Sequence, residues 1–310
     1  MDGTASQKAI AIAHLSGLTA FLLKTRDLVY SCVNGHDILA TVLTPKELQD
    51  QPPCQYPVLV HWHGGGFVLG HRMYAPWWPD WSLQFAQSQS ALIISPDYRL
   101  LPEANGSDIL ADVDEFSNWM RDELPSIADR ESWHASPDLG RVACIGESGG
   151  GWLAMQSALL FSAKIDIKAV ISISAPLDGS CTAKYTVPGP KVILGARPPP
   201  PREAEALIRE YMRSIKPGAV RSEGDPAEMW QLLLCIFQQA WLPRLLGIKA
   251  NPLLNPTMTL NKPDISPPPL WIIHSEQDSV VPVECSVEFA KAVQKTHRAG
   301  SGAWPVTNTY

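Results

Sequence analysis

Short apolar runs alternate with segments of helical periodicity along most of the chain. A run of β-prone apolar residues bounded by turn residues is typical of a buried strand, and apolar positions every three or four residues indicate an amphipathic helix. This alternation predicts an α/β protein with a mostly parallel sheet flanked by helices. The expected strands are 28–33, 38–43, 58–62, 91–95, 142–145, 169–174 and 270–274, and the expected helices are 108–124, 152–163 and 284–296.

The pattern changes between 178 and 266, where helical segments at 203–214 and 227–242 are separated by proline and glycine. Segment 227–242 is apolar around most of its circumference. It is therefore either a helix buried against the body or a lid whose inner face lines an acyl pocket. The apolar stretch 9–23 is interrupted by polar residues and is too short for a membrane span, which favours a helix packed on the body over a targeting segment. We expect a single domain over 1–310, with a helical cap built from about 1–27 and 178–266.

The composition narrows the classes of partner. A hydrophobic content of 45%, a charged content of 18% and a formal net charge of −6 describe a globular protein without a basic run. Nucleic acid and anionic membranes are therefore not expected partners. The cysteines lack close pairs and metal-ligand spacing, which favours reduced thiols in an intracellular, cytoplasmic protein without a metal site. The six are Cys32, Cys54, Cys144, Cys181, Cys235 and Cys285.

A serine motif follows the expected strand 142–145. The sequence Gly146-Glu147-Ser148-Gly149-Gly150 lies between this strand and the expected helix 152–163. A serine between flanking glycines in a strand–turn–helix context predicts a nucleophile elbow, in which the serine hydroxyl is exposed at the sheet edge. The amide of Gly149, near the start of the helix, is then placed to stabilise an oxyanion.

Three consecutive glycines, Gly64, Gly65 and Gly66, follow the expected strand 58–62 and are preceded by His63. Glycines allow the backbone to approach a reacting group closely and to present successive N–H groups to it. The alternative is a flexible turn without a role in catalysis.

These two motifs, together with the run Asp97-Tyr98-Arg99-Leu100-Leu101-Pro102-Glu103, occur in the order found in the hormone-sensitive-lipase-like esterases, which the chain resembles over about 28–296. The resemblance implies an α/β-hydrolase fold with a helical cap and an oxyanion hole formed by Gly65, Gly66 and Gly149. It also implies that His63, beside Gly64, orders the glycine loop and is not the catalytic base. The chain departs from the family pattern in carrying Glu147 where aspartate is usual and Gly149 where alanine is usual.

The catalytic acid is expected in the loop after strand 270–274. Asp278 lies in this loop, and an acid that follows the serine agrees with the chain order of α/β-hydrolases. Glu276 is a second candidate, and Asp278 could alternatively serve only as a helix cap.

The catalytic base is not evident. The resemblance implies a histidine about 30 residues after the acid, beyond one more helix and one more strand, and the chain has none there. His297 lies only 19 residues after Asp278, at the end of the expected helix 284–296, and is the remaining candidate. His274 belongs to the strand before the acid, where a core or supporting role is expected. Segment 297–310 contains glycine and proline, which weaken a strand, so we expect an atypical or truncated C-terminal end.

The sequence therefore predicts a serine-dependent carboxylic ester hydrolase, with thioester hydrolysis and acyl transfer as related reactions, acting without a cofactor. Trp77, Trp78, Trp81 and segment 227–242 suggest an apolar pocket for a small ester. The missing histidine supports a second hypothesis, a catalytically impaired or truncated hydrolase that binds a small ligand. The oligomeric state is not predicted.

Overall fold

The computed structural model describes residues 22–49, 51–178, 186–262 and 265–298. Every strand expected from the sequence is present, and β5 starts seven residues earlier than predicted. The strands are β1 (Leu22–Val33), β2 (His36–Pro45), β3 (Cys54–Trp62), β4 (Leu92–Pro96), β5 (Ala135–Glu147), β6 (Ile167–Ile173) and β7 (Leu270–Ile273). The helices are α2 (Asp80–Ser88), α3 (Gly106–Asp122), α4 (Leu124–Arg130), α5 (Gly149–Leu160), α7 (Pro201–Ser214), α8 (Pro226–Gln238), α9 (Leu242–Leu246), α10 (Pro256–Leu260) and α11 (Glu284–Arg298), with short 3₁₀ turns at Lys46–Gln49, Ala75–Trp77 and Pro252–Leu254.

The strands form a seven-stranded sheet in the order β1-β2-β4-β3-β5-β6-β7. Neighbouring strands are parallel in the part of the sheet that consists of β4, β3, β5, β6 and β7, whereas β2 is antiparallel to both β1 and β4. Asn34 and Gly35 connect β1 to β2 and have positive φ angles of 52° and 80°. Positive φ at both central residues is the geometry of a tight hairpin turn, which the Asn-Gly pair predicts.

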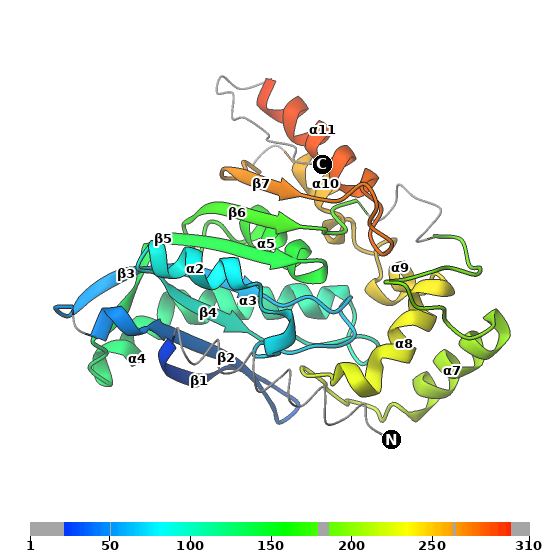
Figure 1. The fold of residues 1–310 in the computed structure, drawn as a ribbon, viewed down its shortest axis with the longest axis horizontal. Coiled ribbons are helices and arrows are strands. Elements are labelled where there is room, and N and C mark those ends of the chain that lie inside the picture. Colours follow the sequence, from blue (N-terminus) through cyan, green and yellow to red (C-terminus); the bar gives the residue numbers. More distant parts are fainter. Residues whose placement is uncertain (1–21, 50, 179–185, 263–264, 299–310) are drawn as a thin grey trace.

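Helices cover both faces of the sheet (Figure 1). On one face, Leu83 and Ala86 of α2 pack against strand residues that include Leu59 and Ile93. On the other face, α3 and α5 pack against the alternate strand residues, such as Val60 and Ile94, in the main core. Successive side chains of a strand point to opposite faces, so each central strand contributes to both apolar layers.

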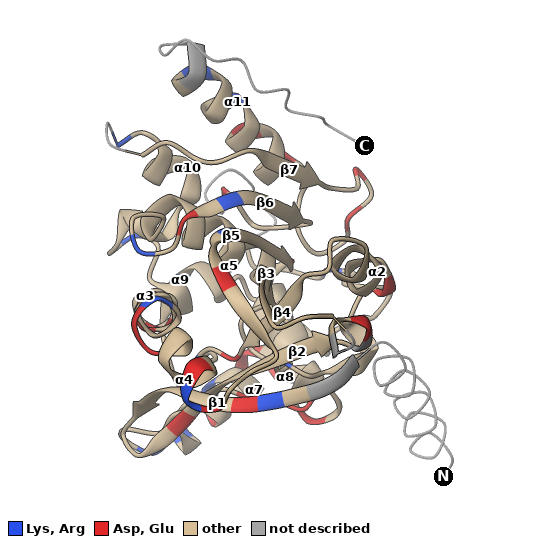
Figure 2. Cartoon of the chain, turned by 90° about the vertical axis from the view of Figure 1, so that its left-hand side faces the viewer, with Lys and Arg blue, Asp and Glu red and all other residues tan. Residues whose placement is uncertain are grey.

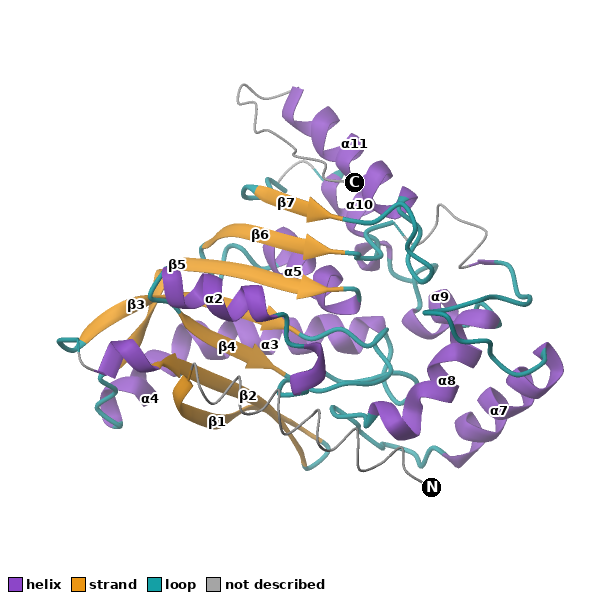
Figure 3. Ribbon diagram, in the orientation of Figure 1, coloured by secondary structure: helices purple, strands orange, loops and turns teal. Residues whose placement is uncertain are grey.

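Helices α7, α8 and α9 lie together beyond the carboxyl ends of the parallel strands (Figure 3). We call this group and the segments that connect its helices the cap, because it lies within 178–266, where a helical cap is expected. Residues 252–260 of the same range pack on α5 instead, where Gln156 donates to the Leu253 carbonyl at 2.7 Å. The helix expected over 227–242 is interrupted after Gln238. Ala240 has a positive φ angle of 55°, and the Trp241 amide donates to the Ile236 carbonyl at 3.0 Å, so the chain leaves the helix here before α9 begins.

The N-terminal boundary of the expected cap also changes. Residues 22–27 belong to β1 and pair with β2, so they are part of the sheet. The expected N-terminal helix and the end of segment 297–310 lie outside the described residues. Charged side chains of both signs occur on β1, whereas β4 in the interior carries none (Figure 2). None of the helices in the described part of the chain combines the length and apolar character needed to cross a membrane.

Candidate active site

Ser148 lies in the sharp turn between β5 and α5. Its φ and ψ angles are 53° and −120°, a conformation that non-glycine residues rarely adopt. Its amide donates to the Ile173 carbonyl of the neighbouring strand at 2.8 Å, which anchors the turn to the sheet. A strained serine between a strand and a helix is the geometry of a nucleophile elbow.

The flanking glycines are required because other backbone atoms occupy the space of a side chain. A Cβ atom on Gly146 would lie 2.3 Å from the Gly150 carbonyl carbon, and one on Gly150 would lie 2.0 Å from the Trp62 carbonyl oxygen. By contrast, a Cβ atom on Gly149 would lie 3.3 Å from the Phe67 ring. The elbow motif therefore reflects close packing of β3, β5 and α5.

The glycine loop after β3 lies directly beside the nucleophile. A Cβ atom on Gly64 would be 3.7 Å from the Ser148 Cβ. Gly65 and Gly66 have φ angles of 103° and 60°, which favour glycine. Within the described part of the chain, no backbone hydrogen bond uses the amide of Gly65, Gly66 or Gly149 as donor. These amides are available for an oxyanion, and Gly149 adds the favourable dipole at the start of α5.

His63 supports this loop from the buried side. Its Nδ1 donates to the Gly64 carbonyl at 2.8 Å, and its ring stacks on Tyr98 with 4.4 Å between ring centroids. Burial lowers the pKa of His63 to about 3, so the ring is neutral near neutral pH and is a weak base. This arrangement agrees with an ordering role for His63.

The run from Asp97 to Glu103 supports the same loop. The Tyr98 hydroxyl donates to the His63 carbonyl at 3.0 Å, and the Leu101 amide donates to the Phe67 carbonyl at 2.7 Å. Asp97 is buried, and its carboxylate accepts hydrogen bonds from the backbone and guanidinium of Arg72. The second motif therefore holds the first in place.

Asp278 lies in the loop after β7. Its Oδ1 accepts hydrogen bonds from the amides of Val280 and Val281 at 2.7 and 2.9 Å, and its Oδ2 is 3.5 Å from His274 Nε2. Burial opposes ionisation, but the hydrogen bonds from His274, the two amides and Ser174 lower the pKa of Asp278 to about 2. Asp278 is a carboxylate at physiological pH and also caps its own turn, whereas Glu276 is exposed.

A cavity of about 300 Å³ brings these residues together. Ser148, Asp278 and the three glycines share its wall with Glu147 and Ser174, and the remaining wall is apolar. Helix α8 supplies Trp230, Leu233 and Phe237, which supports the interpretation of segment 227–242 as the lining of a pocket. The other apolar lining residues are Trp77, Leu194, Val280 and Val281.

Two of the tryptophans expected at the pocket lie elsewhere. Trp78 is buried and packs on His61 with 4.3 Å between ring centroids, and Trp81 is on the surface of α2. Conversely, no sequence pattern pointed to Ser174 or Leu194. Ser174 follows the end of β6 with a φ of 48°, and only the assembled sheet edge shows that it bonds to Asp278.

The described cavity wall contains no histidine. His274 is buried, and its Nδ1 and Nε2 contact the Ser286 hydroxyl and the Val281 carbonyl at 2.7 and 2.9 Å, which is a supporting role beside the acid. His297 lies in the last turn of α11. At about 1.5 Å per residue its backbone is roughly 20 Å along the helix from Glu284, near the start. Helix α11 leads away from the carboxyl ends of the strands, where Ser148 lies (Figure 1).

The fold and this site define an α/β protein with a serine nucleophile elbow at the carboxyl edge of a mostly parallel sheet. The chain belongs to the alpha/beta hydrolase fold family, whose sequence profile matches residues 59–297.

Proteins similar to this chain include two relatives named as carboxylesterases and an esterase of known structure. The chain is 50% identical over 263 residues to "Probable carboxylesterase M8" of a Phoma species, covering 85% of this chain and 81% of that protein. It is 51% identical over 191 residues to "Probable carboxylesterase clz11" of Cochliobolus lunatus, covering 62% of this chain and 86% of that protein. The Pyrobaculum calidifontis esterase has a similar fold, with a TM-score of 0.58 and 19% identity over 99% of this chain and 84% of the other.

Proposed function

We propose that Ser148 is the nucleophile of a carboxylic ester hydrolase. The protein is a carboxylesterase-like hydrolase of the α/β-hydrolase fold family, and relatives named as carboxylesterases share half of its residues over the aligned region. The observation that carries the assignment is the shared cavity, in which Ser148, the glycine loop and the Asp278 carboxylate meet under an apolar wall.

In this reaction the Ser148 oxygen attacks the carbonyl carbon of the ester, and the carbonyl oxygen becomes an oxyanion. The amides of Gly65, Gly66 and Gly149 then donate to this oxyanion, and each such donor contributes about 3–4 kcal/mol to the stability of the transition state. The C–O bond breaks, the alcohol leaves with a proton, and an acyl-serine remains. Water attacks this intermediate, releases the carboxylic acid and restores the serine.

The cavity favours a small, uncharged acyl group. Its volume of about 300 Å³ is at the lower end of the range for ligand sites, and most of its lining is aromatic or aliphatic. Glu147 and Asp278 are the carboxylates of the described wall, so an anionic substrate is disfavoured by repulsion. Short- to medium-chain esters, and thioesters of the same acyl groups, are the proposed substrates.

The proposed triad needs a base that accepts the Ser148 proton. No described histidine lines the cavity with Ser148 and Asp278, and His297, in the last turn of α11, is the candidate base that the labelling experiment below tests. Without an imidazole partner the hydroxyl stays protonated and acylation is slow. This observation favours a second candidate function, binding of a small apolar ligand with little or no turnover.

The test combines turnover with covalent labelling. Ser148→Ala is expected to abolish hydrolysis of p-nitrophenyl butyrate, because loss of a triad member costs about a thousandfold or more, whereas Ser88→Ala on the surface of α2 is the control. Retention of more than a tenth of the activity in Ser148→Ala contradicts the assignment.

Labelling of the wild type with a fluorophosphonate is expected to be slow and confined to Ser148. Rapid stoichiometric labelling contradicts an incomplete triad, and its loss in His297→Ala then identifies His297 as the base. Saturable binding of a butyrate ester analogue without turnover supports the ligand-binding function.

A further inference from the structure

A segment of the cap, residues 221–224, forms hydrogen bonds with the glycine loop after β3, which we call the oxyanion loop (residues 64–70). Gly70, at the end of this loop, forms two backbone hydrogen bonds with Gly224, of 2.7 and 3.0 Å. Arg221, three residues earlier, donates from Nη1 to the Val68 carbonyl at 2.7 Å. Thus a side chain from the cap and a backbone segment beside it bind the loop that carries Gly65 and Gly66.

The Arg221 guanidinium also binds the Asp97–Glu103 run, which supports the oxyanion loop. Arg221 Nη2 donates to the Leu101 carbonyl and to Glu103 Oε2, the latter at 2.9 Å. The Leu101 amide in turn donates to the Phe67 carbonyl at 2.7 Å. One planar group therefore joins the cap, the oxyanion loop and the Asp97–Glu103 run, a geometry that lysine with its single ammonium group does not reproduce.

The oxyanion loop needs external support because its conformation is unfavourable. Gly65, Gly66, Phe67 and Gly70 all have positive φ angles, and Phe67 is not a glycine. Such conformations each cost of order 1–3 kcal/mol for a non-glycine residue and persist only when surrounding contacts fix them. Within the loop, the described backbone hydrogen bonds are those from the Val68 and Leu69 amides to the Gly65 carbonyl, so most of the support comes from outside.

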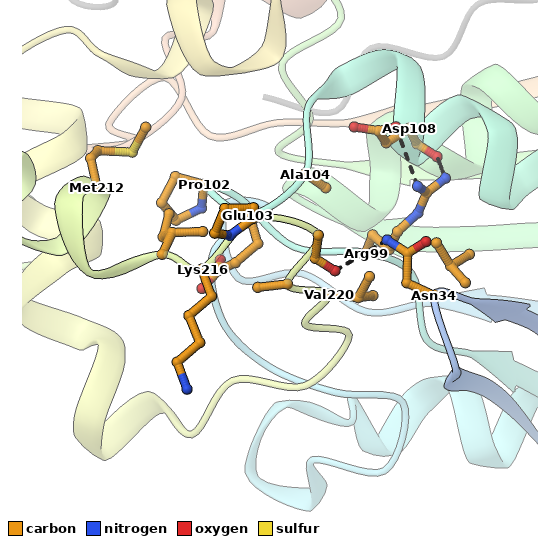
Figure 4. Close-up of a pocket in the computed structure, with 14 residues that line it drawn as sticks. Asn34, Arg99, Pro102, Glu103, Ala104, Asp108, Met212, Lys216 and Val220 are labelled. Carbon is orange, nitrogen blue, oxygen red and sulfur yellow. Dashed lines mark hydrogen bonds and ion pairs between the residues drawn. The ribbon is translucent and has the colours of Figure 1, made fainter.

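Side-chain packing between α7 and Glu103 does not supply this support. A second cavity of about 410 Å³ separates α7 and the segment after it from the Asp97–Glu103 run. Figure 4 shows Pro102, Glu103 and Ala104 of the body together with Met212 and Lys216 of the cap, all of which line this cavity. The Tyr211 hydroxyl donates to Glu103 Oε1 at 2.6 Å. Polar contacts centred on Glu103 and Arg221 therefore connect the cap to the body here.

We propose that Arg221 is a positioning residue that holds the oxyanion loop so that the amides of Gly65 and Gly66 face the Ser148 site. This inference rests on the proposed ester hydrolysis. Arg221 contributes no atom to the described cavity wall and acts through the Val68 and Leu101 carbonyls. Its loss is expected to weaken transition-state stabilisation more than substrate binding.

The test compares Arg221→Met and Arg221→Lys with Arg209→Met, an exposed arginine of α7 that pairs with Glu205. Arg221→Met is expected to lower kcat for p-nitrophenyl butyrate at least tenfold with KM changed less than threefold, since only the transition state uses the oxyanion amides. Arg221→Lys is expected to recover less than a third of the loss, and Arg209→Met to match the wild type.

Hydrogen exchange provides a readout that does not need turnover. In Arg221→Met, amide exchange is expected to accelerate in peptides covering 65–70 and to stay unchanged in β5 and β6. Unchanged exchange at 65–70 overturns the inference, and so does accelerated exchange with an unchanged kcat. If the wild type has no turnover but exchange accelerates locally, the hydrolase assignment fails while the hold of Arg221 on the loop is supported.

Discussion

The two glycines after Ser148 differ in the space around their α-carbons. A Cβ atom on Gly150 would lie 2.0 Å from the Trp62 carbonyl oxygen, a backbone atom of the central sheet. For a Cβ atom on Gly149 the nearest atoms would be those of the Phe67 ring, at 3.3 Å, and alanine gains up to about 1 kcal/mol over glycine in a helix.

Gly150→Ala is therefore expected to lower the free energy of unfolding by about 3 kcal/mol or more, and Gly149→Ala to change it by less than about 1 kcal/mol. Urea denaturation of both variants measures the difference. Equal losses of unfolding free energy in the two variants would show that the sheet backbone adjusts to an added methyl group as easily as the Phe67 ring does.

Single residues were predictable where a motif states a backbone requirement. Ser148 was identified in this way from the motif around it, because backbone packing at Gly146 and Gly150 leaves no space for a Cβ atom. Ser174 and Arg221 were not, because serine and arginine are common on surfaces and their partners, Asp278 and the Val68 carbonyl, are more than a hundred residues away.

At the scale of elements, α8 supplies part of the apolar wall of the cavity that contains Ser148. Leu233 and Phe237 approach the oxyanion loop closely enough that a Cβ atom on Gly66 would lie 2.6 and 2.9 Å from their side chains. Helix α8 thus closes the apolar end of the pocket.

Phe237→Leu is expected to lengthen the pocket and raise the ratio of kcat/KM for the octanoate ester over the butyrate ester roughly tenfold, the effect of a few methylene contacts. Gln231→Ala, on the exposed side of α8, is the control. A ratio that does not change would place the acyl chain elsewhere in the cavity.

Elements with a clear apolar period were predicted, and α2 was missed. Its buried residues are only Ser82, Leu83 and Ala86, while the aromatic Trp81 and Phe85 are exposed. A nine-residue helix with its largest apolar side chains outside has no amphipathic pattern to detect. The break between α8 and α9 was missed because the apolar composition continues across it.

At the scale of the whole molecule, Asp278 links the sheet edge to acid stability. Its pKa of about 2 in the folded protein is below the value of about 3.9 for an unfolded aspartate. Between these values the unfolded chain binds more protons, so this contribution to stability is present above about pH 4 and is lost as the pH falls to about 2.

Asp278→Asn is accordingly expected to be less stable than the wild type at pH 6 and to lose less stability between pH 5 and pH 2. Chemical denaturation across this range measures both slopes. Parallel slopes would mean that Asp278 does not carry the lowered pKa.

The parallel sheet with helices on both faces followed from the alternation of strands and helices. The Asn34–Gly35 turn predicts the antiparallel pairing of β2 with β1. The antiparallel pairing of β2 with β4 was not predicted and is seen only in the structure. The catalytic base could not be deduced, because the position of a histidine relative to the serine depends on long-range folding. No local sequence pattern shows which histidine lies near Ser148.

The tryptophans in the cavity wall also make ligand binding measurable by intrinsic fluorescence. Trp77 and Trp230 line the same cavity as Ser148 and Asp278, whereas Trp62, Trp119 and Trp152 are enclosed in the core. Indole emission depends on the polarity around the ring, so a bound acyl group that displaces water alters the signal from the first pair and leaves the core signal constant. Occupancy of this site is therefore expected to be measurable from intrinsic fluorescence in the Ser148→Ala variant, for which loss of turnover is predicted above.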